Sequence, residues 1–327
     1  MKILLLAALV AFILSVVAGK ITIPLLKRLK VGQPILSYVT EHKEKNGTPT
    51  MGGLFFITSA VIVFFIFGKS VGRLSIVAVS IGVSFMLVGF LDDFIKIKMK
   101  RNEGLKAYQK IIFQTAIAAV AGFFAYKNGL TIFHVPFFNL TVSLGFWTIP
   151  LVALIFIAIT NSVNLTDGLD GLAGSVSAVY LLFLAALITV QSMYFGASLN
   201  CGSENNSLLL LCFTLFGAIC GFLIYNTSKA KVFMGDCGSL SLGGFIGAIS
   251  IFSSNSFFIV VLGIVFVWSS VSVIAQVLYY KKTKKRVFLM APFHHHLQMK
   301  GYSESKIAFI YSAITSIMGA LSVISYL

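Results

Sequence analysis

The chain has 327 residues, of which 58% are hydrophobic and only 11% are charged, and its mean hydropathy is +0.96. A soluble domain carries about 25% charged residues, so this composition excludes a soluble globule, and its apolar richness excludes a disordered chain. A polytopic membrane protein remains, because each span needs about 20 apolar residues and this length accommodates about ten. The net charge of +15 is compatible with nucleic acid, anionic lipid, an anionic substrate or membrane orientation.

Apolar runs separated by polar stretches predict an all-α fold of about ten transmembrane helices in a single domain, residues 1–327. The first run continues past Lys20, so we expect a retained span and not a cleaved secretory signal. The run at 239–252 is short and rich in glycine and has the weakest apolar signal. The predicted spans are 3–26, 51–67, 74–91, 111–127, 146–163, 171–190, 207–225, 239–252, 256–280 and 307–327.

The basic residues predict the orientation of these spans. One alternating set of connecting segments holds 20 of the 25 lysines and arginines, whereas the other set, with both chain ends, holds four. The positive-inside rule makes the first set cytoplasmic and places both termini on the periplasmic or extracellular side. Topology thus accounts for the basic excess, so we expect no nucleic-acid partner. The cytoplasmic set comprises residues 27–50, 92–110, 164–170, 226–238 and 281–306.

Side chains able to do chemistry gather on the same side. Nine of the ten acidic residues and four of the five histidines fall in or beside the predicted cytoplasmic segments. The near absence of charge at mid-span argues against a proton relay or an ion path across the bilayer. The four cysteines show no spacing typical of a metal or disulfide framework.

The first polar motif is Lys45-Asn-Gly-Thr-Pro-Thr-Met-Gly-Gly53, before the second span. It lacks the Gly-Lys-Ser/Thr order of a Walker loop, and it is compatible with phosphate contact or with plain helix capping. The second motif is Asp92-Asp93, at the inner end of the third span. Adjacent carboxylates resist joint ionisation unless a cation such as Mg²⁺ is near. The alternative is an interfacial pair that reaches water, with Asp92 paired to Lys96 one helical turn on.

The third motif, Asn161-Ser-Val-Asn-Leu-Thr-Asp-Gly-Leu-Asp-Gly-Leu-Ala-Gly174, joins two spans. Its carboxylates, amides and hydroxyl suit a nucleoside or a hydrated cation, and its glycines permit tight turns. A capped link between helices is the alternative. So many polar groups in one turn favour a functional site.

The fourth motif, Asn226-Thr-Ser-Lys-Ala-Lys-Val-Phe-Met-Gly-Asp-Cys-Gly-Ser239, leads into the glycine-rich span. Asp236 can present its carboxylate to a metal while the helix N-terminus faces a phosphate, or it can simply cap that helix. Phe233 can stack on a base or anchor at the membrane interface.

The fifth motif, Ala291-Pro-Phe-His-His-His-Leu-Gln298, has no zinc-ligand spacing. We interpret it as a loop that places one or two imidazoles at an anionic site, with a plain polar interfacial loop as the alternative. All five motifs fall at the predicted cytoplasmic face. Together they indicate a site for a polyanion with Mg²⁺.

In sequence and order these motifs resemble the polyprenyl-phosphate N-acetylhexosamine-1-phosphate transferase superfamily. Within it they resemble the bacterial phospho-N-acetylmuramoyl-pentapeptide-transferases, with Pro292-Phe-His-His-His-Leu297 as the most specific piece. The resemblance covers essentially the whole chain. It implies a multi-pass enzyme of the bacterial inner (cytoplasmic) membrane, a homodimer, that attaches phospho-N-acetylmuramoyl-pentapeptide from its UDP derivative to undecaprenyl phosphate. The products are lipid I and UMP, and Mg²⁺ is required.

The resemblance also implies roles for individual residues. Asp236 is the first expected ligand of Mg²⁺, with Asn164 and Asp93 as further ligands, and Asp92 would deprotonate or orient the lipid phosphate. The remaining expected site residues are His294 and His295 for the pyrophosphate or sugar, Asp167 as a further substrate-binding residue, Gly168, Leu169, Asp170 and Phe233 for uridine, and Lys45, Thr50, Lys110 and Gln276 along the substrate path.

Three other functions compete with this one. A sibling enzyme would transfer N-acetylglucosamine-1-phosphate from UDP-N-acetylglucosamine. A transporter of a nucleotide or a lipid intermediate would need a polar path across the bilayer, which the clustering of charge at one face argues against. A non-catalytic scaffold would tolerate loss of the aspartates.

Overall fold

The computed structural model describes residues 1–28, 47–68, 71–99, 104–135, 137–138, 140–199, 202–227 and 229–326. The long helices are α1 (Lys2–Arg28), α2 (Gly53–Phe67), α3 (Arg73–Lys98), α4 (Ala107–Lys127), α5 (Thr148–Thr166), α6 (Leu172–Leu199), α7 (Gly202–Asn226), α8 (Gly235–Phe252), α10 (Ile264–Thr283) and α12 (Glu304–Ile324). The short elements are β1 (Ile132–Val135), β2 (Leu140–Ser143), a 3₁₀ turn (Gly145–Trp147), α9 (Phe258–Leu262) and α11 (Phe293–Met299).

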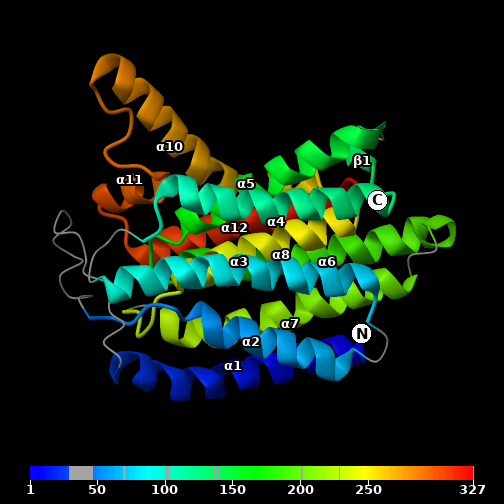
Figure 1. The fold of residues 1–327 in the computed structure, drawn as a ribbon, viewed down its shortest axis with the longest axis horizontal. Helices are drawn as coiled ribbons and strands as arrows, with labels where there is room; N and C mark the ends of the chain where they lie inside the picture. Colours follow the sequence, from blue (N-terminus) through cyan, green and yellow to red (C-terminus); the bar gives the residue numbers. More distant parts are fainter. Residues whose placement is uncertain are drawn as a thin grey trace.

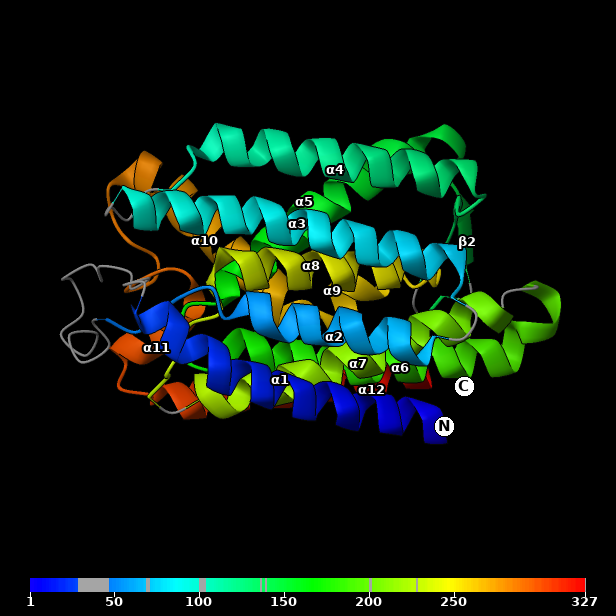
Figure 2. The ribbon, with the colours of Figure 1, turned by 60° about the horizontal axis from the view of Figure 1, so that its bottom comes forward.

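Most of the long helices run side by side in one elongated bundle (Figures 1 and 2). Within the described residues, nine helices are long and apolar enough to cross a membrane, and α2 is a shorter apolar helix of 15 residues. They overlap the predicted spans, which confirms the architecture of a polytopic helical membrane protein. The count of ten stays a prediction, because 15 helical residues extend only about 22 Å against a hydrocarbon thickness of about 30 Å.

Helix α8, the span with the weakest apolar signal in the sequence, packs at the centre of the bundle. Every residue from Cys237 to Phe252 is buried, and α8 contacts α2, α3 and α5. Its glycines permit this, since a Cβ added at Gly243 would lie 2.5 Å from the backbone of Thr160 in α5. Small residues that let backbones approach closely are typical of helix contacts in membranes. The low apolar content of α8 therefore reflects its burial among other helices of the protein.

The predicted span at 256–280 is broken in the structure. Helix α9 ends at Leu262, and α10 begins at Ile264 after Gly263. Helix α10 then diverges from the other helices (Figure 1). It packs on α5, where Ser269 and Ser270 hydrogen-bond to Thr166 and Ser162. Its other side is apolar and exposed, with Trp268, Val271, Ile274, Val277 and Leu278.

A short antiparallel hairpin departs from the all-α prediction. Strands β1 and β2 pair with Phe133 opposite Val142 and His134 opposite Thr141. They lie within the segment 128–145, which the sequence presented only as a loop. Strands of four residues carry too little alternation to be recognised without their partner.

Both termini lie at one end of the bundle, and α11 lies at the opposite end (Figures 1 and 2). The described parts of the predicted cytoplasmic segments share the α11 end, because successive long helices alternate in direction. The five polar motifs therefore meet at one end as predicted, apart from their residues outside the described ranges. Which membrane face this end occupies stays a prediction from the charge count.

Candidate active site

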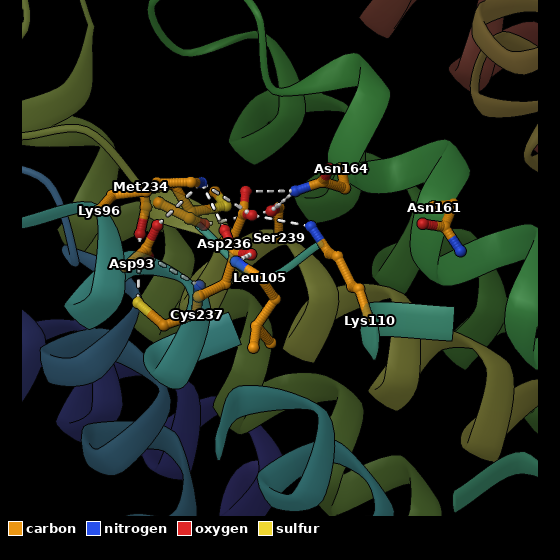
Figure 3. A network of polar contacts seen from close by, with 12 residues as sticks. Asp93, Lys96, Leu105, Lys110, Asn161, Asn164, Met234, Asp236, Cys237 and Ser239 are labelled. Carbon is orange, nitrogen blue, oxygen red and sulfur yellow. Dashed lines mark hydrogen bonds and ion pairs between the residues drawn. The ribbon is translucent and has the colours of Figure 1, made fainter. Parts of the chain in front are cut away.

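Three carboxylates meet where the end of α3 contacts the start of α8. One oxygen each from Asp92, Asp93 and Asp236 lies within 4.8 Å of the others. Figure 3 shows part of this cluster with the polar groups around it. Asp92 and Asp93 are 3% and 0% exposed, so they do not reach out to water as an interfacial pair would.

Backbone geometry brings the third carboxylate to the other two. Gly89 of α3 leaves no room for a side chain, because an added Cβ would overlap the carbonyl of Asp236. Gly235 begins α8 with φ of +75°, a conformation that favours glycine. Asp93 then accepts a hydrogen bond from the Cys237 N–H at 3.1 Å. A carboxylate at a helix N-terminus is electrostatically favourable, so Asp93 helps to hold the first turn of α8.

Lys96 lies among all three carboxylates. Its Nζ is 2.6 Å from Asp92 Oδ2, 3.0 Å from Asp236 Oδ2 and 3.5 Å from Asp93 Oδ1. The spacing of four residues along the helix predicted the pair with Asp92 as part of the alternative interpretation. It did not predict the bond to Asp236, which lies 140 residues further along the chain.

Asp236 takes donors from two further helices. Lys110 of α4 places its Nζ 2.8 Å from Asp236 Oδ2, the same oxygen that Lys96 contacts. Asn164 of α5 donates from Nδ2 to Asp236 Oδ1 at 2.7 Å and to Ser239 Oγ at 2.8 Å. The N-cap residue of α8 is Met234, so Asp236 is not the N-cap of its own helix. Its carboxylate is therefore directed into the cluster, which favours the functional interpretation over simple capping.

The segment before α4 closes the cluster on another side. The Leu105 N–H donates to Asp92 Oδ1 at 2.9 Å. A Cβ added at Gly104 would lie 2.6 Å from that carboxylate, so only a glycine fits here without a shift. Both oxygens of Asp92 thus have donors, one from the backbone and one from Lys96.

The first polar motif pairs with the approach to α8. The Phe233 N–H donates to the Pro49 carbonyl at 2.8 Å, and the Gly52 N–H donates to the Phe233 carbonyl at 2.9 Å. Thr50 lies beside the cluster, because a Cβ on Gly235 would be 2.7 Å from its Oγ1. That buried Oγ1 has no hydrogen-bond partner among the described residues. Lys45 lies outside the described residues.

The turn between α5 and α6 forms a second group. The Asp170 N–H donates to Glu304 of α12 at 2.8 Å, and the Asp170 carboxylate accepts the Ala230 N–H at 2.9 Å. Leu169 is 5% exposed and belongs to the hydrophobic core. The hydrogen bonds of Asp170 to Glu304 and Ala230 thus fix the turn from both sides. In the same turn, burial, with smaller effects from nearby carboxylates, raises the pKa of Asp167 well above its ordinary value.

The histidines lie in the first turn of the short helix α11, where the sequence predicted a loop. His294 is fully buried, and neither of its ring nitrogens has a hydrogen-bond partner among the described residues. Burial, with a smaller effect from His295, lowers the pKa of His294 to about 3. A Cβ on Gly168 would lie 2.9 Å from His295 Nε2 and would overlap the ring of His294. The histidines therefore pack directly on the turn after α5, and His294 is neutral.

Gln276 of α10 braces the segment that leads to α11. Its side-chain oxygen accepts the N–H groups of Val287 and Phe288 at 3.0 and 2.9 Å, and its nitrogen donates to the Phe288 carbonyl at 3.1 Å. Four residues earlier on the same helix, Ser272 accepts the Phe293 N–H at 3.1 Å. In this structure Gln276 holds a loop, and its predicted contact with substrate stays a prediction.

The structure thus joins the predicted residues into two adjoining groups. Asp92, Asp93, Asp236, Asn164, Lys110 and Thr50 surround the carboxylate cluster, whereas Gly168, Leu169, Asp170, His294 and His295 form the turn and helix beside it. Sequence reasoning missed three contributors: Lys96 as the centre of the cluster, the Leu105 N–H, and Glu304. Lys96 carried a local signal in its spacing of four residues from Asp92, and Glu304 carried one as an isolated acid in the last basic segment.

The donor set fits a magnesium ion. Hard divalent cations prefer carboxylate oxygens, and three are available here. Asp93 Oδ1 is buried and makes no hydrogen bond among the described residues, its one recorded contact being Lys96 at 3.5 Å. Asn164 is a donor to Asp236 in this structure, so its predicted role as a ligand requires its amide oxygen and stays a prediction.

Fold and site together define a multi-pass membrane protein with a buried cluster of acids and lysines, suited to a reaction between anionic substrates. Residues 74–254 match the family profile described as glycosyl transferase family 4. Residues 45–57 match phospho-N-acetylmuramoyl-pentapeptide-transferase signature 1.

Curated relatives extend this match over nearly the whole chain. A phospho-N-acetylmuramoyl-pentapeptide-transferase of Clostridium novyi is 42% identical, covering 99% of this chain and 97% of its own length. Those of Clostridioides difficile and Clostridium acetobutylicum are 39% and 36% identical, covering 97% and 99% of this chain and 96% and 99% of their own lengths. The chain belongs to the phospho-N-acetylmuramoyl-pentapeptide-transferase family, which makes it a membrane transferase.

Proposed function

We propose that the protein transfers phospho-N-acetylmuramoyl-pentapeptide from UDP-N-acetylmuramoyl-pentapeptide to undecaprenyl phosphate, giving lipid I and UMP. This is the first membrane step of peptidoglycan synthesis, at the cytoplasmic face of the bacterial inner membrane. Family membership supports the activity. The observation that carries the assignment of the site is the cluster of Asp92, Asp93 and Asp236 with Lys96 and Lys110 at one end of the bundle. We also propose that the protein works as a homodimer, as the family resemblance implies.

The reaction balances as a phosphoryl transfer. An oxygen of the lipid phosphate forms a bond to the β-phosphorus of the UDP-sugar, and the bond from that phosphorus to the bridging oxygen breaks. The bridging oxygen leaves with UMP. Because both reactants are anions, the site must position them and neutralise their charge. Lys96 and Lys110, beside the aspartates, supply positive charge at that point.

Asp92 is the residue we assign to the lipid phosphate. Its carboxylate is held from both sides by the Leu105 N–H and by Lys96, which fixes its direction. A phosphate monoester has a second pKa near 6, so little proton removal is needed at neutral pH. We therefore assign Asp92 mainly to orienting the lipid phosphate with Lys96, and proton acceptance is its secondary role.

Asp236 and Asp93 would hold Mg²⁺, with Asp92 and Asn164 next to them. When bound, the ion neutralises charge on the phosphate oxygens of the transferring group. The uridine end would lie along Gly168, Leu169, Asp170 and Phe233, and His294 and His295 would contact the pyrophosphate or sugar. Lys45, Thr50 and Gln276 complete the proposed substrate path.

A direct test mixes purified protein with undecaprenyl phosphate, Mg²⁺ and one of two UDP-sugars, and measures UMP release. We expect UMP only with UDP-N-acetylmuramoyl-pentapeptide. Release from UDP-N-acetylglucosamine would instead identify the sibling enzyme. No UMP from either sugar, with substrate moved across vesicles, would identify a transporter.

The same assay tests the cluster. The Asp236→Asn variant removes one charge from the oxygen that Lys96 and Lys110 share. We expect product formation to fall by at least about 1,000-fold, since one essential electrostatic contact is worth about 4 kcal/mol in a transition state. Glu204, at the other end of the bundle, provides the matched control, and Glu204→Gln should keep the activity. Full activity of Asp236→Asn would refute the assignment.

A further inference from the structure

Lys96 occupies the place in the cluster that a cation would take. Its ammonium contacts one oxygen of each carboxylate, Asp92 Oδ2, Asp93 Oδ1 and Asp236 Oδ2. Its side chain is only 15% exposed, so the charge is held inside the protein. An ammonium among three carboxylates does what a bound metal ion would do: it offsets their mutual repulsion.

The other carboxylate oxygens have separate donors. Asp92 Oδ1 accepts from Leu105, Asp93 Oδ2 from Cys237, and Asp236 Oδ1 from Asn164. The three oxygens that could turn to a metal are therefore the three that Lys96 contacts. Of these, only Asp236 Oδ2 has a second cation among the described residues, Lys110 at 2.8 Å.

We infer that the Lys96 ammonium occupies the position of a divalent metal ion and must move away before the metal can bind. Metal binding is therefore weak until a phosphate-bearing substrate is present and offers the displaced ammonium a new partner. Three carboxylates and two ammonium groups leave a formal charge of only −1, which attracts a divalent ion poorly. A bound diphosphate adds negative charge and offers Lys96 new partners. The metal and the nucleotide then strengthen each other's binding, because such coupling is reciprocal.

This inference rests on the proposed function for the identity of the metal and the nucleotide. Beyond that function, Lys96 has a definite role, because it makes tight binding of the metal depend on the presence of the phosphate-bearing substrate. A protein without substrate would hold little metal, and its carboxylates would still be neutralised.

The test is an Mn²⁺ titration, followed by electron paramagnetic resonance, of full-length protein without any sugar substrate. Coulomb's law in water gives about 30-fold for a unit charge about 4 Å from a divalent ion, so we expect Lys96→Gln to bind Mn²⁺ about tenfold to thirtyfold more tightly than the wild type. Lys96→Arg keeps the charge and should bind as weakly as the wild type. Lys98→Gln is the matched control, an equal change of net charge at an exposed position on the same helix.

Equal Mn²⁺ affinities for the wild type, Lys96→Gln and Lys98→Gln would overturn the inference, and so would a folded Lys96→Gln variant that binds no Mn²⁺. If Lys96→Gln does not fold, the wild type alone decides. Its Mn²⁺ affinity must rise at least about fivefold on adding UDP, after correction for Mn²⁺–UDP in solution. No rise overturns the inference. These measurements involve no transfer, so they can fail while UMP release succeeds, and the reverse.

Discussion

The buried, neutral His294 makes the stability of the protein depend on pH. Its pKa is about 3 because burial disfavours the charged ring, whereas an exposed histidine has a pKa near 6.5. Between these values the unfolded chain binds a proton that the folded chain does not. Folding stability contributed by this residue is therefore fully present above pH 6.5 and is lost progressively as the pH falls toward 3.

The size of the effect follows from the two pKa values. At pH 5.5 an exposed imidazole is about 90% protonated and His294 is not, which costs about 1.4 kcal/mol relative to pH 7.5. For a chain of 327 residues the loss corresponds to a fall in Tm of about 2 °C.

Thermal unfolding in detergent measures this effect at pH 7.5 and pH 5.5. The wild type should lose about 2 °C more between these pH values than the His294→Gln variant, whose side chain does not titrate. His296, which is only partly buried, provides the control, and His296→Gln should keep most of the wild-type loss. An identical loss of Tm in the wild type and His294→Gln would refute the reasoning, because the titration would then belong to other groups.

Three further predictions concern the site and its support. Asp92→Asn should lower turnover by at least about tenfold while leaving UDP-sugar binding within about twofold; lost binding with unchanged turnover would move Asp92 to the nucleotide. Gln276→Ala removes three hydrogen bonds from residues 287–288, so hydrogen exchange there should accelerate by at least about tenfold, and unchanged exchange would contradict the bracing role. Gly243→Ala should destabilise the protein by about 2 kcal/mol more than Gly247→Ala in thermal unfolding. The added methyl at residue 243 would lie 2.5 Å from backbone, whereas the one at residue 247 would lie 3.0 Å or more from side chains. Equal destabilisation by the two substitutions would contradict the packing argument.

Much of the architecture could be predicted because the bilayer imposes a strong pattern on sequence. The apolar runs gave the positions of the long helices, and the polar motifs correctly indicated one shared end. Interruptions were harder to predict. Gly263 looked like an ordinary residue within the run at 256–280, yet α9 ends before it and α10 takes another direction after it. Glycine is common in membrane helices, so its presence does not distinguish a break from a close contact.

The sequence allowed the residues of the candidate site to be predicted, but not the contacts between residues that lie far apart in the chain. Asp92 and Lys96 are one helical turn apart, so their pair follows from local geometry. The bond from Lys96 to Asp236 depends on the packing of α3 on α8, which no local spacing encodes. The glycine-rich motif at 47–53 shows the same limit: phosphate contact and capping were considered, whereas the structure pairs its backbone with Phe233.

The complete burial of α8 bears on how the protein is inserted into the membrane. Its serines find partners on neighbouring helices, Ser241 on the Gly82 carbonyl of α3 and Ser250 on Tyr180 of α6. A helix entering lipid alone would leave such hydroxyls with only its own backbone to bond. We therefore expect α8 to enter the bilayer efficiently only after α3 and α6 are in place. The order of synthesis meets this requirement, because α3 and α6 both precede α8 in the chain. Truncated chains that lack α3 should therefore fail to retain α8 in the membrane.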